Sequence, residues 1–77
     1  MYWLDTSQKY IGSPAQQSFY ADSTDDIKNL PTSTKEGVKQ GADSTSYRKT
    51  AKGSQCLVID SSEVYMLKSD DTWKLLG

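Results

Sequence analysis

The clearest pattern of apolar and polar positions lies in the last third of the chain. Three largely apolar runs are separated there by two clusters of turn-forming Asp, Ser, Glu and Thr residues, and in order these five segments are 56–59, 60–63, 64–68, 69–72 and 73–76. Short runs of β-branched and aromatic residues bounded by such clusters are typical of β-strands joined by tight turns. The pattern therefore predicts a C-terminal three-stranded meander.

Further extended segments are predicted nearer the start of the chain. Residues 2–4 and 9–12 flank a polar stretch and repeat the order of aromatic residue, turn and aromatic residue found at the end, so we expect a second hairpin there. Residues 17–21 have the aromatic density of one more strand, in which Phe19 and Tyr20 face opposite sides of the sheet. The predicted fold class is mainly β, a small α+β fold at most, built from antiparallel hairpins.

One short helical turn is predicted at about 24–30. The Ser, Thr and Asp residues at 22–26 offer a hydroxyl that can cap a helix, followed by carboxylates that the helix dipole favours in its first turn. Pro31 disfavours helical geometry at the residue before it, so the helix ends there. We expect Ile27 and Leu30 to attach this turn to the sheet.

The segment 32–52 has no clear period and is predicted to be a polar basic loop or arm within a single small domain of residues 1–77. Residues 28–52 contain six Lys or Arg residues against two acidic ones, a net charge of +4, while the rest of the chain carries −5 and the whole chain −1. Such asymmetry can steer docking to an acidic partner or to a second copy of the chain. A solvated polar loop is the alternative interpretation.

Two structures are open for this arm. Either residues 37–41 form a turn before a short edge strand near Tyr47, or the arm is ordered only against a partner. Aromatic and Arg side chains concentrate binding energy at interfaces, so Tyr47 and Arg48 are the strongest candidates. The full set of candidate partner-binding residues is Lys35, Lys39, Tyr47, Arg48, Lys49 and Lys52.

Length and composition indicate that a partner contributes to stability. A chain of 77 residues with 35% hydrophobic residues has enough apolar side chains for one thin sheet, but not for two packed layers and a cavity. We therefore expect a homo-oligomer, with a trimer as the first choice. The side chains expected to be buried, in the domain or in its oligomer interface, are Trp3, Leu4, Phe19, Ile27, Leu30, Val58, Tyr65 and Trp73.

Candidate chemistry is sparse. The chain has no His, so neither a nucleophilic triad nor a typical structural zinc site can be assembled. The adjacent carboxylates of Asp25-Asp26 and Asp70-Asp71 point apart in a turn, so we interpret them as caps and turn residues. Cys56 is the only cysteine, and its apolar neighbours indicate a small buried hydrophobe. We expect no catalytic residues, no metal and no cofactor.

Two other classes of partner are not expected. A basic arm beside aromatic residues is also found in nucleic-acid binders, but the isoelectric point of about 5.1 leaves no dense basic face. No apolar run approaches the roughly 20 residues needed to span a bilayer, and the first residues lack the basic and apolar regions of a signal peptide. We expect no membrane association and synthesis in a reducing cytoplasm.

Three motifs resemble those of small virion proteins of tailed bacteriophages, including proteins on or near the head. They are DIKNLP at 26–31, GSQCLVIDSSEVYM at 53–66 and TWKLL at 72–76, and the resemblance extends over about 19–76. It implies a structural hairpin and supplies no catalytic residues.

The function that this resemblance implies is a non-enzymatic structural component of a bacteriophage virion, assembled in the host cytoplasm. Such a subunit binds the major capsid protein or other virion proteins as a head decoration or head-fibre attachment subunit. Weak contacts of each copy are sufficient for this, because the symmetry of the particle repeats them many times. A neck, tail or baseplate adaptor and a small nucleic-acid-binding module are the alternatives.

Overall fold

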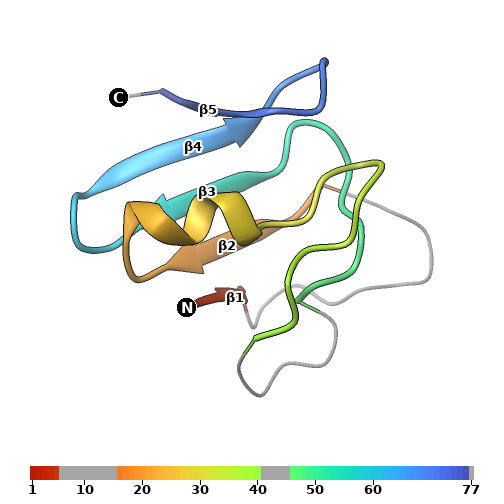
Figure 1. Ribbon diagram of the computed structural model, residues 1–77. Coiled ribbons are helices and arrows are strands. Elements are labelled where there is room, and N and C mark those ends of the chain that lie inside the picture. The colour runs from red at the N-terminus through yellow and green to blue at the C-terminus, as the bar shows by residue number, and fades with distance from the viewer. Residues whose placement is uncertain (6–15, 41–45, 77) are drawn as a thin grey trace.

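The computed structural model describes residues 1–5, 16–40 and 46–76, and it is mainly β (Figure 1). In these residues five short strands form one mixed sheet, ordered as they follow one another in the chain, and a 3-10 helix precedes the third strand. The predicted fold class is therefore confirmed. The elements are β1 (Tyr2–Leu4), β2 (Ser18–Ala21), η1 (Thr24–Asn29), β3 (Gln55–Val58), β4 (Glu63–Leu67) and β5 (Trp73–Leu75).

The predicted C-terminal meander is confirmed. β3 pairs antiparallel with β4, and β4 pairs antiparallel with β5, so that Cys56 lies opposite Tyr65. In the second turn Asp71 has a φ of 70°, and the Asp70 carboxylate accepts hydrogen bonds from the backbone N–H (3.2 Å) and the hydroxyl (2.7 Å) of Thr72. Asp adopts left-handed backbone conformations more readily than most residues, which explains the acidic pair at this turn.

The other half of the sheet differs from the expected second hairpin. β1 pairs antiparallel with β2, and Trp3 lies opposite Tyr20, whereas the expected return strand at 9–12 lies outside the described residues. β2 and β3 are parallel. A parallel pair requires a crossover connection of about a dozen residues or more, and the chain between these strands, 22–54, supplies it. Alternation of apolar residues does not encode strand direction, so this pairing was not predicted.

The predicted helical turn is confirmed as η1, which lies across one face of the sheet (Figure 1). The Asp26 carboxylate accepts a hydrogen bond from the Ser23 N–H (3.2 Å) and lies 2.7 Å from the amino group of Met1. These contacts join the start of η1 to the start of β1. Leu30 is buried in the core and Ile27 packs against it, so both residues attach the turn to the sheet.

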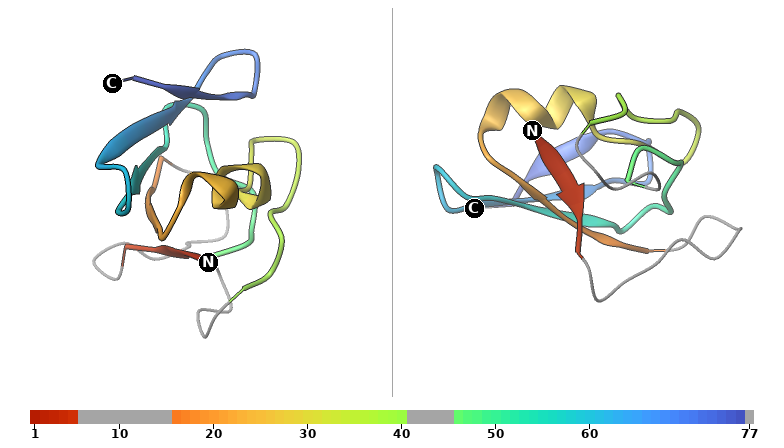
Figure 2. Two further views of the ribbon diagram at one scale, coloured as in Figure 1. Left: turned by 60° about the vertical axis from the view of Figure 1, so that its left-hand side comes forward. Right: turned by 90° about the horizontal axis from the view of Figure 1, so that it is seen from below.

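The described part of the arm lies on the same side of the sheet as η1 (Figure 2). The Tyr2 hydroxyl donates to the Val38 carbonyl (2.7 Å), the Val38 N–H donates to the Asn29 carbonyl (2.8 Å), and the Gly37 N–H donates to the Tyr47 carbonyl (2.6 Å). Contacts within the chain thus position 32–40 and 46–52. Tyr47 lies in a turn, so the edge strand considered there is wrong for the described residues.

Gly37 is required where the arm crosses Tyr2. A Cβ at this position would lie 2.5 Å from the Tyr2 hydroxyl oxygen and 2.6 Å from the Asn29 carbonyl oxygen, closer than carbon and oxygen atoms approach without displacement. The absence of a side chain therefore lets the arm lie directly on the buried end of β1.

The core occupies the face of the sheet that η1 and the arm cover. Neighbouring aromatic rings meet edge to face, Tyr2 with Phe19 and Phe19 with Trp73, each with ring centroids 6.2 Å apart. Such aromatic contacts add to the free energy of burying the rings. The core cluster consists of Tyr2, Leu4, Phe19, Ala21, Leu30, Cys56 and Val58.

Most of the predicted core residues lie in or against this cluster. Leu4, Phe19, Leu30 and Val58 are buried, and Ile27, Tyr65 and Trp73 pack against them partly exposed. Trp3 is the exception, because neighbouring residues of a strand point to opposite faces and Tyr2 occupies the core position. The burial expected for Trp3 in an oligomer interface stays a prediction.

Candidate functional site

The described residues contain one cysteine and several carboxylates whose placement can be examined for chemistry. Among them, no group of three or more His, Cys, Asp and Glu side chains is placed to hold a metal ion. Cys56 is fully buried, and this burial raises the pKa of its thiol to about 12, so the nucleophilic thiolate is scarcely populated at neutral pH. In the described part of the chain no helix is both long and apolar enough to cross a membrane.

A cavity of about 340 Å³ lies between η1, the first part of the arm and the turn before β5. Its wall includes Lys28, Lys35, Glu36 and Asp71, so it carries charges of both signs.

Asp71 is engaged within this wall. Its carboxylate accepts hydrogen bonds from the Ser33 N–H (2.8 Å), the Ser33 hydroxyl (2.6 Å), the Thr34 N–H (3.1 Å) and the Thr34 hydroxyl. Desolvation raises the pKa of Asp71, but these hydrogen bonds outweigh it and hold the pKa well below its usual range. The geometry assigns Asp71 a structural task, namely to attach the arm to the turn before β5.

Three of the six predicted partner-binding residues form a cluster on the arm. The Lys39 ammonium lies 5.4 Å from the centroid of the Tyr47 ring, and the centre of the Arg48 guanidinium lies 5.9 Å from it. Both distances allow cation–π attraction, which is modest at an exposed site. We call Lys39, Tyr47 and Arg48 the basic cluster. It combines a half-buried aromatic ring with two positive charges.

The other three candidates are not part of this cluster. Lys35 lines the 340 Å³ cavity beside Asp71 and Trp73. Lys49 and Lys52 are exposed on the way to β3, and the Lys52 carbonyl accepts a hydrogen bond from the Gln16 side-chain amide at 3.4 Å. They add to the positive charge of the arm.

A second surface lies on the face of the sheet opposite η1, which we call the outer face. Strand register places one apolar side chain from each of the strands β1 to β4 in a single row across it. Trp3 pairs with Tyr20, Tyr20 with Leu57, and Leu57 with Val64. The Leu76 N–H donates to the Val64 carbonyl (2.8 Å), which extends the row beyond β5. We call these five residues the apolar row.

The apolar row is partly accessible to solvent. Leu57 is 40% exposed and Leu76 57%, while Trp3, Tyr20 and Val64 are half-buried. The rings of Trp3 and Tyr20 lie 5.9 Å apart at an angle of 39°. No helix or strand of the described residues covers this face, which is unusual because sheets normally bury an apolar face against a second layer.

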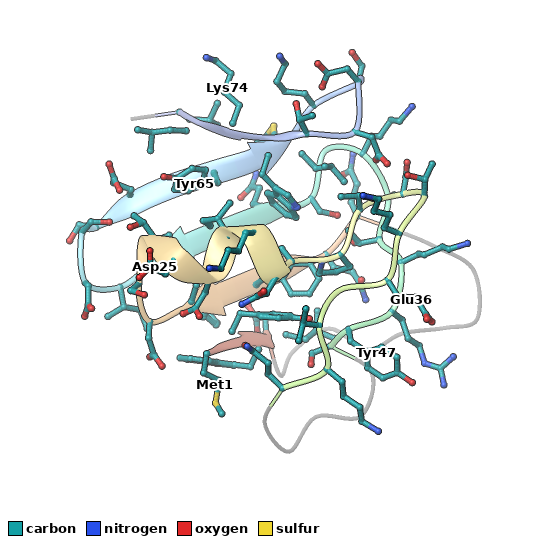
Figure 3. The ribbon with its side chains drawn as sticks, in the orientation of Figure 1. Met1, Asp25, Glu36, Tyr47, Tyr65 and Lys74 are labelled. Atoms are coloured by element: carbon teal, nitrogen blue, oxygen red, sulfur yellow. The ribbon has the colours of Figure 1, made fainter. Side chains whose placement is uncertain are left out.

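The neighbouring row on the outer face, which we call the polar row, is polar except at Met66 and carries opposite charges at its two ends. In order across the strands it contains Asp5, Ser18, Gln55, Met66 and Lys74. Asp5 follows β1 and accepts a hydrogen bond from the Tyr20 hydroxyl (3.3 Å). Lys74 is exposed on β5, far from Tyr47 of the basic cluster (Figure 3). A shallow hollow of about 210 Å³ lies between Asp5, Gln55 and Leu57.

Most of the apolar row was not identified as a candidate site from the sequence, although the sequence contains a signal for it. The runs at 56–59 and 64–67 are continuously apolar instead of alternating. Continuous apolar runs are typical of strands whose two faces are both covered.

Comparisons with protein-family models, with curated proteins and with solved structures found no match to this chain.

Proposed function

We propose that this chain is a non-enzymatic structural component of a tailed-bacteriophage virion, which binds other virion proteins as a head decoration or head-fibre attachment subunit. The observation that carries the proposal is the distribution of binding surface. The chain has a sheet that its described elements cover on one face only, an apolar row that crosses β1 to β4 and ends at Leu76, and a basic cluster on the arm. The assignment to a virion rests on the resemblance of the motifs at 26–31, 53–66 and 72–76 to those of small virion proteins.

The basic cluster supports docking to an acidic surface of another virion protein. Its two cations flank the Tyr47 ring, a combination of aromatic and Arg side chains that is enriched at the centres of interfaces. The Gly37 N–H bond to the Tyr47 carbonyl connects this residue to a segment packed on the core. Docking there requires little ordering of the backbone, so less binding free energy is lost on association.

Incorporation into particles tests the proposed function. The particles are produced from the genome that encodes the chain, purified by sedimentation and analysed for the chain by mass spectrometry. The double variant Tyr47→Ala, Arg48→Ala is expected to reduce incorporation at physiological salt about tenfold or more, because it removes the ring and one of its cations. Lys28→Ala on η1 is the matched control, since it removes an exposed positive charge outside the basic cluster.

The outcomes of this experiment are distinct. Absence of the unmodified chain from purified particles would refute the virion role. Normal incorporation of the double variant would leave the virion role standing and remove the basic cluster from it. The position of the chain in an immunolabelled particle separates the head from the neck, tail or baseplate alternatives.

One observation favours a small nucleic-acid-binding module as the second candidate. Trp3 and Tyr20 present neighbouring aromatic rings on an open sheet face, and such rings stack on unpaired bases in single-strand binders. The charge around them weakens this candidate, because Asp5 adjoins the pair and the basic cluster lies on the arm, on the other side of the sheet. Fluorescence polarisation with labelled oligonucleotides decides it: binding that falls steeply with salt supports this module over a virion subunit.

A further inference from the structure

We propose that the outer face is a self-association surface, on which two copies of this chain pack sheet against sheet about a two-fold axis parallel to the strands. This inference deepens the proposed assembly role. It rests on the proposed function only for the expectation that the dimer is part of a virion. It names the occupant of the outer face as a second copy, which gives a dimer in place of the trimer that was the first choice from the sequence.

The apolar row supplies the first argument, because it matches itself under this symmetry. A two-fold axis along the strands places β1 of one copy over β5 of the other and leaves β3 over β3. Trp3 then faces Leu76, Tyr20 faces Val64, and Leu57 faces its own counterpart. Every contact in the row is apolar on both sides, as an isologous interface requires.

The polar row supplies a second argument. The same axis brings Asp5 at one end of the row over Lys74 at the opposite end of the partner's row, and the symmetry forms this pair twice. Gln55 on the central strand faces its own counterpart and can exchange amide hydrogen bonds with it. An in-plane axis perpendicular to the strands does not place Asp5 over Lys74. The charges therefore select one orientation of the two that stack the faces.

The size of the face sets the expected strength. Five strands spaced about 4.8 Å apart make a face roughly 24 Å wide, and the described strands are three to five residues long. At about 3.4 Å per residue these strands are about 10–17 Å long, so the two faces bury roughly 800 Å² in total. This is the size of a weak, transient contact, and we expect a dissociation constant of tens of micromolar. The sheets would lie about 10 Å apart, as in aligned sandwiches.

Sedimentation velocity of the full chain, from about 1 to about 200 µM, measures this association. The parent chain is expected to change from monomer to dimer across the range. Leu57→Asp places two carboxylates against each other on the axis and should weaken the dimer about tenfold or more. Because Asp is unfavourable in a central strand, circular dichroism and melting at about 1 µM must show that this variant remains folded.

A charge exchange makes the test specific to the proposed axis. Lys74→Glu should weaken the dimer, because the new carboxylate faces Asp5 of the second copy. The double variant Asp5→Lys, Lys74→Glu has the net charge of the parent and should restore the dissociation constant to within about threefold. Lys28→Glu on η1 is the matched control and should leave the dimer unchanged.

Three results would overturn the proposal. The first is that the parent chain stays monomeric up to about 200 µM. The second is that Leu57→Asp and Lys74→Glu both fold and associate with the dissociation constant of the parent. The third is that the double variant Asp5→Lys, Lys74→Glu dimerises no more tightly than Lys74→Glu alone. Particle incorporation is measured separately. A chain that enters particles but stays monomeric in solution refutes this inference alone, whereas a dimer that is absent from particles refutes the virion role alone.

Discussion

Trp73 connects the C-terminal meander to the segment that covers the core, so replacing it tests how the two halves of the fold are held together. Its indole N–H donates to the Pro31 carbonyl at 3.0 Å, across 42 positions of the chain. Its ring meets Phe19 edge to face at 6.2 Å. Two substitutions separate these contributions, because Trp73→Phe keeps an aromatic ring and removes the hydrogen bond, while Trp73→Ala removes both.

The magnitudes follow from these contacts. Loss of one hydrogen bond lowers the free energy of unfolding by about 1 kcal/mol for Trp73→Phe. Truncation of a fully buried aromatic side chain to Ala costs about 3–5 kcal/mol. Because Trp73 is only partly buried, we expect about 2–4 kcal/mol for Trp73→Ala. In a domain of this length 1 kcal/mol corresponds to a shift in Tm of about 4–8 °C, so the two variants are easily resolved.

Urea unfolding followed by far-ultraviolet circular dichroism measures these differences at about 1 µM, where association contributes least. Lys74→Ala on the same strand is the matched control, because an exposed side chain is expected to change stability by less than about 0.5 kcal/mol. If Trp73→Ala were no less stable than this control, Trp73 would not join the meander to the arm, and the assignment of the core would be wrong at this end of the sheet.

Three further predictions concern Gly37, Asp71 and Cys56. Gly37→Ala should lose about 2 kcal/mol or more in the same urea assay, because its methyl group overlaps Tyr2 and the backbone. The pKa of Asp71 is lowered from 3.8 in the folded chain, so the ionised carboxylate stabilises the fold fully above that pH and this stabilisation is lost on acidification. Below about pH 4, Tm should therefore fall less steeply for Asp71→Asn than for the parent. The Cys56 thiol should react with a disulfide reagent at pH 8 only when urea opens the fold, and rapid reaction of the native chain would contradict its burial.

The parts of the fold that were predicted correctly depend on neighbours in the chain. The turns at 60–63 and 69–72 separate the strands of the meander. The Ser and Asp residues before Ile27 start η1, and Pro31 ends it. The pairing of β1 with β2 and the parallel pairing of β2 with β3 depend on contacts between distant segments. Strand composition is the same for either direction, so those pairings could not be predicted from it.

The same distinction applies to the candidate surfaces. Charge and residue type identified Lys39, Tyr47 and Arg48 from the sequence, and the structure brings these three residues together. The apolar row could not be assembled from the sequence, because its membership depends on register. A shift of one residue in β3 would place Cys56 in the row and Leu57 in the core.

The division of apolar residues between the two faces connects the stability of this chain with its assembly. The arm and η1 cover one face, and they do so with loops, a single 3-10 helix and few apolar side chains of their own among the described residues. The apolar row on the other face contributes little to the isolated domain while it remains in contact with water. In the proposed dimer a second copy supplies that layer and removes the row from water, so that assembly would add burial that a small single-layer domain lacks. The proposed dimer would account for the thin core and the apolar outer face together, because each copy would complete the second layer of the other.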